Sequence, residues 1–64
     1  MTTQQLEETA RTLATIDGVL AALPTRGRVR AEIEANRVQL GETAKLVALA
    51  LREARAAAGS EALL

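Results

Sequence analysis

The 64-residue sequence contains no cysteine, no histidine, and no phenylalanine, tryptophan or tyrosine. Without cysteine, disulfide bonds and thiolate chemistry are excluded. Without histidine, the chain lacks the commonest general base and the commonest metal ligand. The serine and threonine hydroxyl groups therefore have only one lysine, Lys45, to activate them as nucleophiles. We expect a protein that is not an enzyme, with no catalytic residues, no cofactor and no metal site.

The chain also lacks an excess of charge and a long apolar run. Eight basic residues balance eight acidic residues, so no net charge attracts nucleic acid or an anionic membrane. The longest apolar run, 46–51, is far shorter than the roughly 20 residues that cross a bilayer. Residues 1–5 do not have the pattern of a secretory signal. These absences argue against membrane and nucleic acid as partners, and they predict a cytoplasmic protein.

The composition of the chain favours helices throughout. Alanine, leucine, glutamate, arginine and glutamine dominate, and they lose little side-chain freedom in a helix. Pro24, the only proline, and Gly27 predict a turn. The sequence therefore predicts an all-α fold, an antiparallel helical hairpin that forms a single domain over 1–64. Its expected parts are a helix at about 3–22, a turn at 23–27, a helix at about 27–58 and a flexible tail at 60–64.

Each expected helix carries a stripe of apolar or small residues at spacings of three and four. The first stripe consists of Leu6, Thr9, Leu13, Ile16, Leu20 and Leu23. The second consists of Val29, Ile33, Leu40, Val47, Leu51, Ala54 and Ala58. We expect the two stripes to form the seam between the helices, with Asn36 and Thr43 at its border fixing the register or lining a ligand pocket. The solvated face of the second helix should then carry Arg30, Glu34, Arg37, Lys45, Arg52 and Arg55.

Two glycines interrupt the expected helices. Gly18 lies in the first and allows a kink there, because glycine costs roughly 1 kcal/mol relative to alanine inside a helix. Gly41 lies in the second, and a break at this residue would give three helices instead of two. At the other extreme, Thr2 and Gln5 have the spacing of a capping box, which predicts a well-defined start for the first helix.

A hairpin folded about Thr25 leaves part of the second helix uncovered. Because both helices rise about 1.5 Å per residue, Asp17 should lie beside about residue 33 and Glu7 beside about residue 43. The first helix then ends opposite residues 46–48, and residues 49–58 project beyond it. The expected interface with an oligomer or another partner consists of Val38, Leu46, Leu49 and Leu51. We predict self-association into a dimer or higher oligomer, most simply a dimer that forms a four-helix bundle; the competing hypothesis is a different protein docked on this strip.

Four arginines gather near the start of the second helix. They are Arg26, Arg28, Arg30 and Arg37. Together with the free backbone N–H groups of the helix start, they could bind a phosphate, a nucleotide or another anionic small molecule. Alternatively they are a solvated surface, because Glu32 and Glu34 stand four residues after two of them and partly neutralise their charge.

Two resemblances bear on the function. In length and plan the chain resembles plasmid copy-control proteins of the Rop type, which dimerise into a four-helix bundle and bind RNA loops; the aromatic and lysine residues of that RNA-binding face have no counterparts here. Another stretch resembles the second helix of the hairpin domain in phage proteins that sequester immune nucleotide signals. The residues that carry this second resemblance are Ile33, Asn36, Arg37, Val38, Gln39 and Gly41.

Three functions follow from these observations. We expect a small non-enzymatic helical protein that acts through protein–protein interaction and self-association, as an adaptor, an inhibitor or a chaperone-like protein. The first alternative is a phage-type oligomeric sponge for a nucleotide or another anionic small molecule, bound by Arg26, Arg28 and Arg30. The second alternative is an RNA-binding bundle similar to the Rop type.

Overall fold

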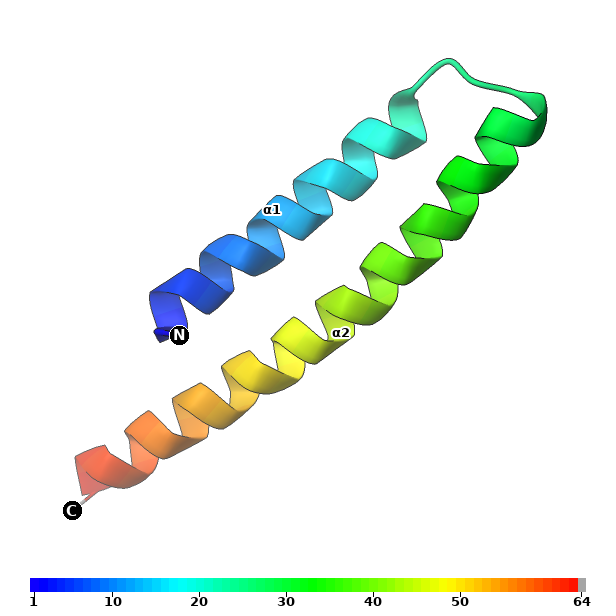
Figure 1. Cartoon of the computed structure of the whole chain (residues 1–64). Coiled ribbons are helices and arrows are strands. Elements are labelled where there is room, and N and C mark those ends of the chain that lie inside the picture. The colour runs from blue at the N-terminus through cyan, green and yellow to red at the C-terminus, as the bar shows by residue number, and fades with distance from the viewer. Residues whose placement is uncertain (64) are drawn as a thin grey trace.

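Over residues 1–63, the computed structural model is an antiparallel hairpin of two α-helices (Figure 1). α1 spans Thr3–Ala22 and α2 spans Gly27–Leu63. The structure describes the backbone of residues 1–63 and the side chains of residues 1–59. The hairpin is a thin rod, 56 × 15 × 13 Å in extent. The predicted all-helical hairpin is confirmed.

Local side-chain chemistry sets the two ends of α1. At its start, the Gln5 amide donates to Thr2 Oγ1 over 3.1 Å, and the Thr2 amide donates to Gln5 Oε1 over 2.8 Å. This reciprocal capping box satisfies two backbone N–H groups that the first helical turn cannot satisfy. At its end, Pro24 disfavours helical backbone at the preceding residue, and Leu23 is extended with φ −63° and ψ 134°.

α2 begins and continues without a break at its glycines. Gly27 has φ +65°, a left-handed conformation that glycine adopts without the steric cost a side chain would incur. The helix passes through Gly41 unbroken, so the chain does not form three helices. It also runs to Leu63, past the end expected near residue 58, since Gly59 lowers helix propensity without preventing helical backbone. The flexible tail expected at 60–64 falls outside the side chains that the structure describes and stays a prediction.

The seam between α1 and α2 consists of residues that recur every seven positions. On α1 these are Thr3, Leu6, Ala10, Leu13, Asp17 and Leu20. On α2 they are Arg30, Ile33, Arg37, Leu40, Ala44, Val47, Leu51 and Ala54. All fourteen are buried or half-buried. Among the side chains that the structure describes, only Leu6 and Leu51 are fully buried, each 8% exposed. The core of a single chain is therefore very small.

The seam is rotated by about one residue from the expected stripes. Ile16, Leu23 and Val29, which were expected in the seam, are exposed. Asn36 is exposed as well, so it does not fix the register of the hairpin. Its side-chain amide instead donates to the Glu32 carbonyl over 3.1 Å.

Two arginines that were expected on the solvated face lie in the seam. Arg30 and Arg37 are half-buried there because each contacts groups on α1, and these contacts stabilise the rotated arrangement. Arg30 donates to a backbone carbonyl near the end of α1, and Arg37 donates to the carboxylate of Asp17. The sequence pattern is wrong on this point, since charge alone does not place an arginine in solvent when a partner is available across the seam.

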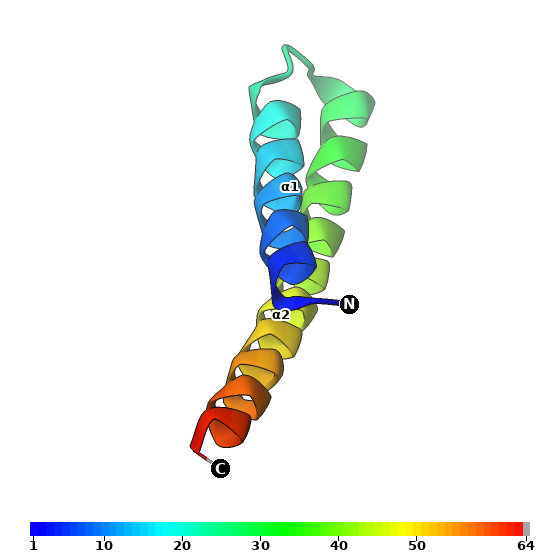
Figure 2. The same cartoon turned by 90° about the vertical axis from the view of Figure 1, so that its left-hand side faces the viewer.

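The register of the hairpin also differs from the expected one. Glu7 pairs with Arg55, with 3.0 Å between Oε1 and Nη2, although it was expected beside about residue 43. Figure 1 shows the reason: residues 23–26 carry the chain past the end of α1 before α2 begins. α1 therefore reaches further along α2, and the expectation that Leu51 has no intrachain cover is wrong. The last part of α2 still projects beyond α1 (Figures 1 and 2).

Candidate functional site

A network of ion pairs crosses the middle of the seam. The Arg37 guanidinium donates to Asp17 Oδ1 over 2.9 Å and to Glu34 Oε2 over 3.1 Å. These hydrogen bonds hold the pKa of Asp17 below its ordinary value and raise the pKa of Arg37. Since both partners belong to this chain and touch no open cavity, the network fixes how the two helices meet rather than forming a reactive site.

The Asp17–Arg37 pair was not predicted from the sequence. Carboxylates were considered only as partners of other carboxylates, and Arg37 was placed in solvent. The pair was detectable in principle, because both residues stand at spacings of seven from apolar or small seam residues: Asp17 from Ala10, and Arg37 from Ala44. A search for opposite charges on facing heptad positions would have found it.

Three of the four arginines expected to bind an anion contact acceptor groups of this chain. Arg28 Nε lies 3.2 Å from Glu32 Oε1, in an exposed pair. Arg30 pairs with Glu34 over 2.9 Å and donates to the Ala21 carbonyl over 3.3 Å. Arg37 is engaged as described above. Within residues 1–59, the structure gives Arg26 no ion pair. The N–H groups offered to an external anion are thus fewer than the sequence indicates.

One broad side of the hairpin carries no charge, and we call it the uncharged face. Its residues each precede a seam position by one residue: Thr9, Ile16, Leu23, Val29, Asn36, Thr43 and Ala50. Because α1 and α2 are antiparallel, positions that precede the seam in this way lie on the same side of the hairpin. Val29 is 58% exposed, Ile16 42% and Leu23 39%. A continuous uncharged surface therefore runs along both helices.

The polar groups on the uncharged face are partly satisfied within their own helices. Thr9 Oγ1 donates to the Gln5 carbonyl over 2.8 Å, and Asn36 Nδ2 donates to the Glu32 carbonyl. Covering the face with apolar groups would leave these hydrogen bonds intact, which lowers the cost of removing Thr9 and Asn36 from water. The residues that follow seam positions lie on the opposite side of the hairpin, and they include Glu7, Glu34 and Arg55.

The outer side of α2 carries a second apolar surface, which includes three of the four expected interface residues. Val38 is 64% exposed, Leu46 67% and Leu49 51%. These residues lie about half a turn away from the seam, on the side of α2 opposite α1. Leu51, the fourth expected residue, belongs to the seam. The structure therefore brings Val38, Leu46 and Leu49 onto one surface and separates Leu51 from them.

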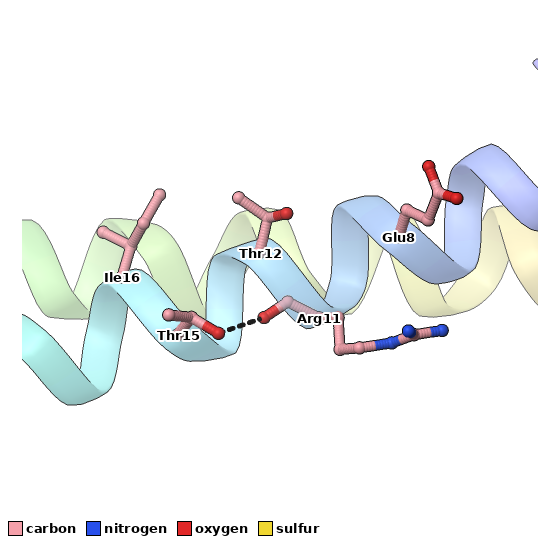
Figure 3. A pocket seen from close by; sticks show the side chains of 5 residues that line it. All are labelled: Glu8, Arg11, Thr12, Thr15 and Ile16. Carbon is pink, nitrogen blue, oxygen red and sulfur yellow. Dashed lines mark hydrogen bonds between the residues drawn. The ribbon is translucent and has the colours of Figure 1, made fainter.

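A shallow hollow lies on the outer side of α1 (Figure 3). It is lined by Glu8, Arg11, Thr12, Thr15 and Ile16. The side chains of Glu8, Thr12 and Ile16 leave one side of the helix and those of Arg11 and Thr15 the other. Thr15 Oγ1 donates to the Arg11 carbonyl over 3.0 Å, so this hydroxyl is occupied. A hollow lined by one helix cannot surround a ligand as binding pockets do.

The described residues contain no cluster of three or more aspartates or glutamates that could hold a metal ion. Over the same part of the chain, neither helix is long and apolar enough to cross a membrane. Comparison of the sequence and structure with protein-family models, curated proteins and solved structures found no match. The candidate functional surfaces are therefore the uncharged face and the outer side of α2.

Proposed function

We propose that this chain is a small non-enzymatic helical binding protein that acts in the cytoplasm through protein–protein contacts, and that its basic unit is a homodimeric four-helix bundle. The observation that carries the proposal is the uncharged face, where exposed apolar residues of both helices lie on one side of the hairpin. In the dimer, the uncharged faces of two chains pack together.

The distribution of polarity around each helix supports a bundle rather than a lone hairpin. One row of the seam is polar or small and contains Asp17, Arg30 and Arg37, whereas the other row and the uncharged face are apolar. The centre of the apolar surface thus lies between the seam and the uncharged face. A helix with two neighbours, as in a four-helix bundle, has this distribution, because its apolar surface points to the bundle axis.

The small core of the single chain supports the same conclusion. Two fully buried side chains, Leu6 and Leu51, leave most large apolar residues partly wet. A domain of this size buries only about 60% of the surface that its unfolded chain exposes, and it usually needs a staple, a metal or a partner. The chain has no cysteine to form a disulfide. A second copy supplies the missing burial.

The two alternative functions have less support. A sponge for anionic small molecules requires guanidinium groups directed at the ligand, and those of Arg28, Arg30 and Arg37 already contact carboxylates. An RNA-binding bundle requires a basic or aromatic surface, and the balanced charge and absence of aromatic residues provide neither.

The proposal is tested by following mass and helicity together as the protein is diluted. Sedimentation equilibrium should give the mass of a dimer or a higher oligomer. The melting temperature followed by circular dichroism should rise with protein concentration, because association stabilises the folded state by mass action. A stably helical monomer whose melting temperature does not depend on concentration would contradict the proposal.

A further inference from the structure

The outer side of α2 remains uncovered in the proposed four-helix bundle. α1 lies along one side of α2 in both views, and the opposite side is open along its length (Figures 1 and 2). The residues there recur at spacings of four and three, and we call them the outer strip. They are Ala31, Ala35, Val38, Glu42, Lys45, Leu49, Arg52 and Ala56, with Leu46 at the edge.

We propose that the outer strip is a second interface between copies of this chain, in which two α2 helices pack antiparallel with Val38 of one chain opposite Leu49 of the other. The pattern of the strip is self-complementary in this register. Val38 meets Leu49, Glu42 meets Lys45, and Ala31 meets Ala56, each pair occurring twice about a twofold axis between residues 43 and 44. Ala35 meets Arg52, whose aliphatic stem covers a small side chain.

The charges at the centre of the strip select this arrangement over others. In a parallel pair, Glu42 would face Glu42 and Lys45 would face Lys45, which brings like charges together. Moving the antiparallel register by seven residues in one direction puts Arg28 opposite Arg52 and Val38 opposite Glu42. Moving it by seven in the other direction puts Lys45 opposite Leu49. The proposed register alone matches apolar with apolar and acid with base at the centre.

The glutamate and lysine at the centre are positioned to exchange partners. Within one chain, Lys45 Nζ lies 3.5 Å from Glu42 Oε1, and both side chains are largely exposed. An exposed pair three residues apart contributes little to helix stability, so the partner chain can replace it at small cost. The apolar contacts between Val38 and Leu49 then flank two ion pairs rather than a single one.

The interface lies outside the proposed function's uncharged face, so a chain that uses both surfaces forms a tetramer or a larger assembly. The inference rests on self-association being part of the function, but the two surfaces are separable by mutation. Leu49→Glu should abolish the outer-strip contact and leave the four-helix bundle, which halves the assembly's mass. Its dissociation constant at this step should rise at least about thirtyfold, since each contact loses a partly buried leucine twice.

Disulfide trapping gives the sharpest test, because the natural chain has no cysteine. Chains carrying Val38→Cys and chains carrying Leu49→Cys are mixed, equilibrated and oxidised. The proposed register brings these Cα atoms within the roughly 7 Å that a disulfide requires, so the mixed disulfide should form rapidly. The controls are a mixture of Lys45→Cys with Leu49→Cys, which links in the shifted register, and Val38→Cys alone, which links in a parallel pair.

Charge reversal gives a second and independent readout. Glu42→Lys should weaken the outer-strip contact, and the double variant Glu42→Lys, Lys45→Glu should restore it, with helicity by circular dichroism unchanged throughout. Preferential linking in either control, or no linking in any mixture while the wild type sediments as a dimer, overturns the outer-strip interface and leaves the proposed function intact. A wild type that sediments as a helical monomer overturns both.

Discussion

Replacement of Val29 by glutamate tests whether the uncharged face is the dimer interface. Val29 is exposed in the single chain, and it is the third residue of α2. A glutamate in the first turn interacts favourably with the helix dipole, and glutamate has a better helix propensity than valine. The substitution should therefore not weaken the isolated helix, and any loss of stability must come from association.

The size of the effect follows from the exposure of Val29. Complete burial of a valine side chain contributes about 1.5 kcal/mol, and 58% of this side chain remains to be covered, which leaves about 0.9 kcal/mol for each chain. The twofold symmetry of a homodimer counts the residue twice, so the apolar loss alone is about 1.7 kcal/mol. Removing two carboxylates from water adds to this, and a total of at least about 3 kcal/mol raises the dissociation constant more than a hundredfold.

Sedimentation velocity and circular dichroism over the same range of concentrations measure the outcome. The Val29→Glu chain should sediment with a smaller mass than the wild type and should lose helical signal on dilution at higher concentrations. Ala48→Glu is the matched control, because Ala48 is exposed on the charged side of α2 and a glutamate there stands three and four residues from Lys45 and Arg52. It should associate as the wild type does.

Two results would refute the reasoning. If Val29→Glu associates as tightly as the wild type, the uncharged face does not form the dimer. If Ala48→Glu dissociates as strongly as Val29→Glu, the added negative charge acts on the whole molecule rather than at an interface. A fall in helicity that does not depend on concentration would mean that the substitution damages the hairpin itself.

Three further predictions concern the hairpin. Gly41→Ala should raise the free energy of unfolding by about 1 kcal/mol, because no atom outside its own helix lies within 4 Å of the position that the added methyl group would take, whereas Gly27→Ala should lower it by about 1–2 kcal/mol because φ is +65° there; urea denaturation measures both. Thr25→Val should be neutral or stabilising by up to about 1 kcal/mol in the same assay, because Thr25 Oγ1 is buried and has no hydrogen-bond partner among the described residues. The hydrogen bond from Arg37 lowers the pKa of Asp17 below its ordinary 3.8, so its contribution to stability should be present above that pH and lost as the pH falls through the lowered pKa; acid titration of the wild type against Asp17→Asn should show this loss only in the wild type.

The sequence predicts the elements of the fold because local chemistry determines them. The capping box at Thr2 and the backbone restriction imposed by Pro24 act within a few residues, and both give the expected result. Propensity alone does not decide whether α2 breaks at Gly41, since tertiary packing and helix cooperativity outweigh about 1 kcal/mol at one residue.

The rotation and register of the seam were not predictable by the same means. The stripes mark the centre of the apolar surface on each helix, and the expected seam assumed that this centre faces the other helix of the same chain. Asp17 and Arg37 contradict that assumption, because their ion pair occupies the middle of the seam. The register depends on how far residues 23–26 carry the chain before α2 begins, and it decides that Leu51 is covered.

The polar row of the seam gives the hairpin its orientation toward a partner. If Asp17, Arg30 and Arg37 were apolar, both rows of the seam would be equally suited to intrachain packing, and the helices could rotate to bury Ile16 and Val29 within one chain. Such a rotation of the present chain would break the Asp17–Arg37 contact and the hydrogen bonds from Arg30 to the end of α1, leaving half-buried charged groups without partners. The ion pairs therefore hold the apolar residues outward, on the uncharged face. The seam thus selects the surface by which the protein associates, and the association supplies the burial that the seam lacks.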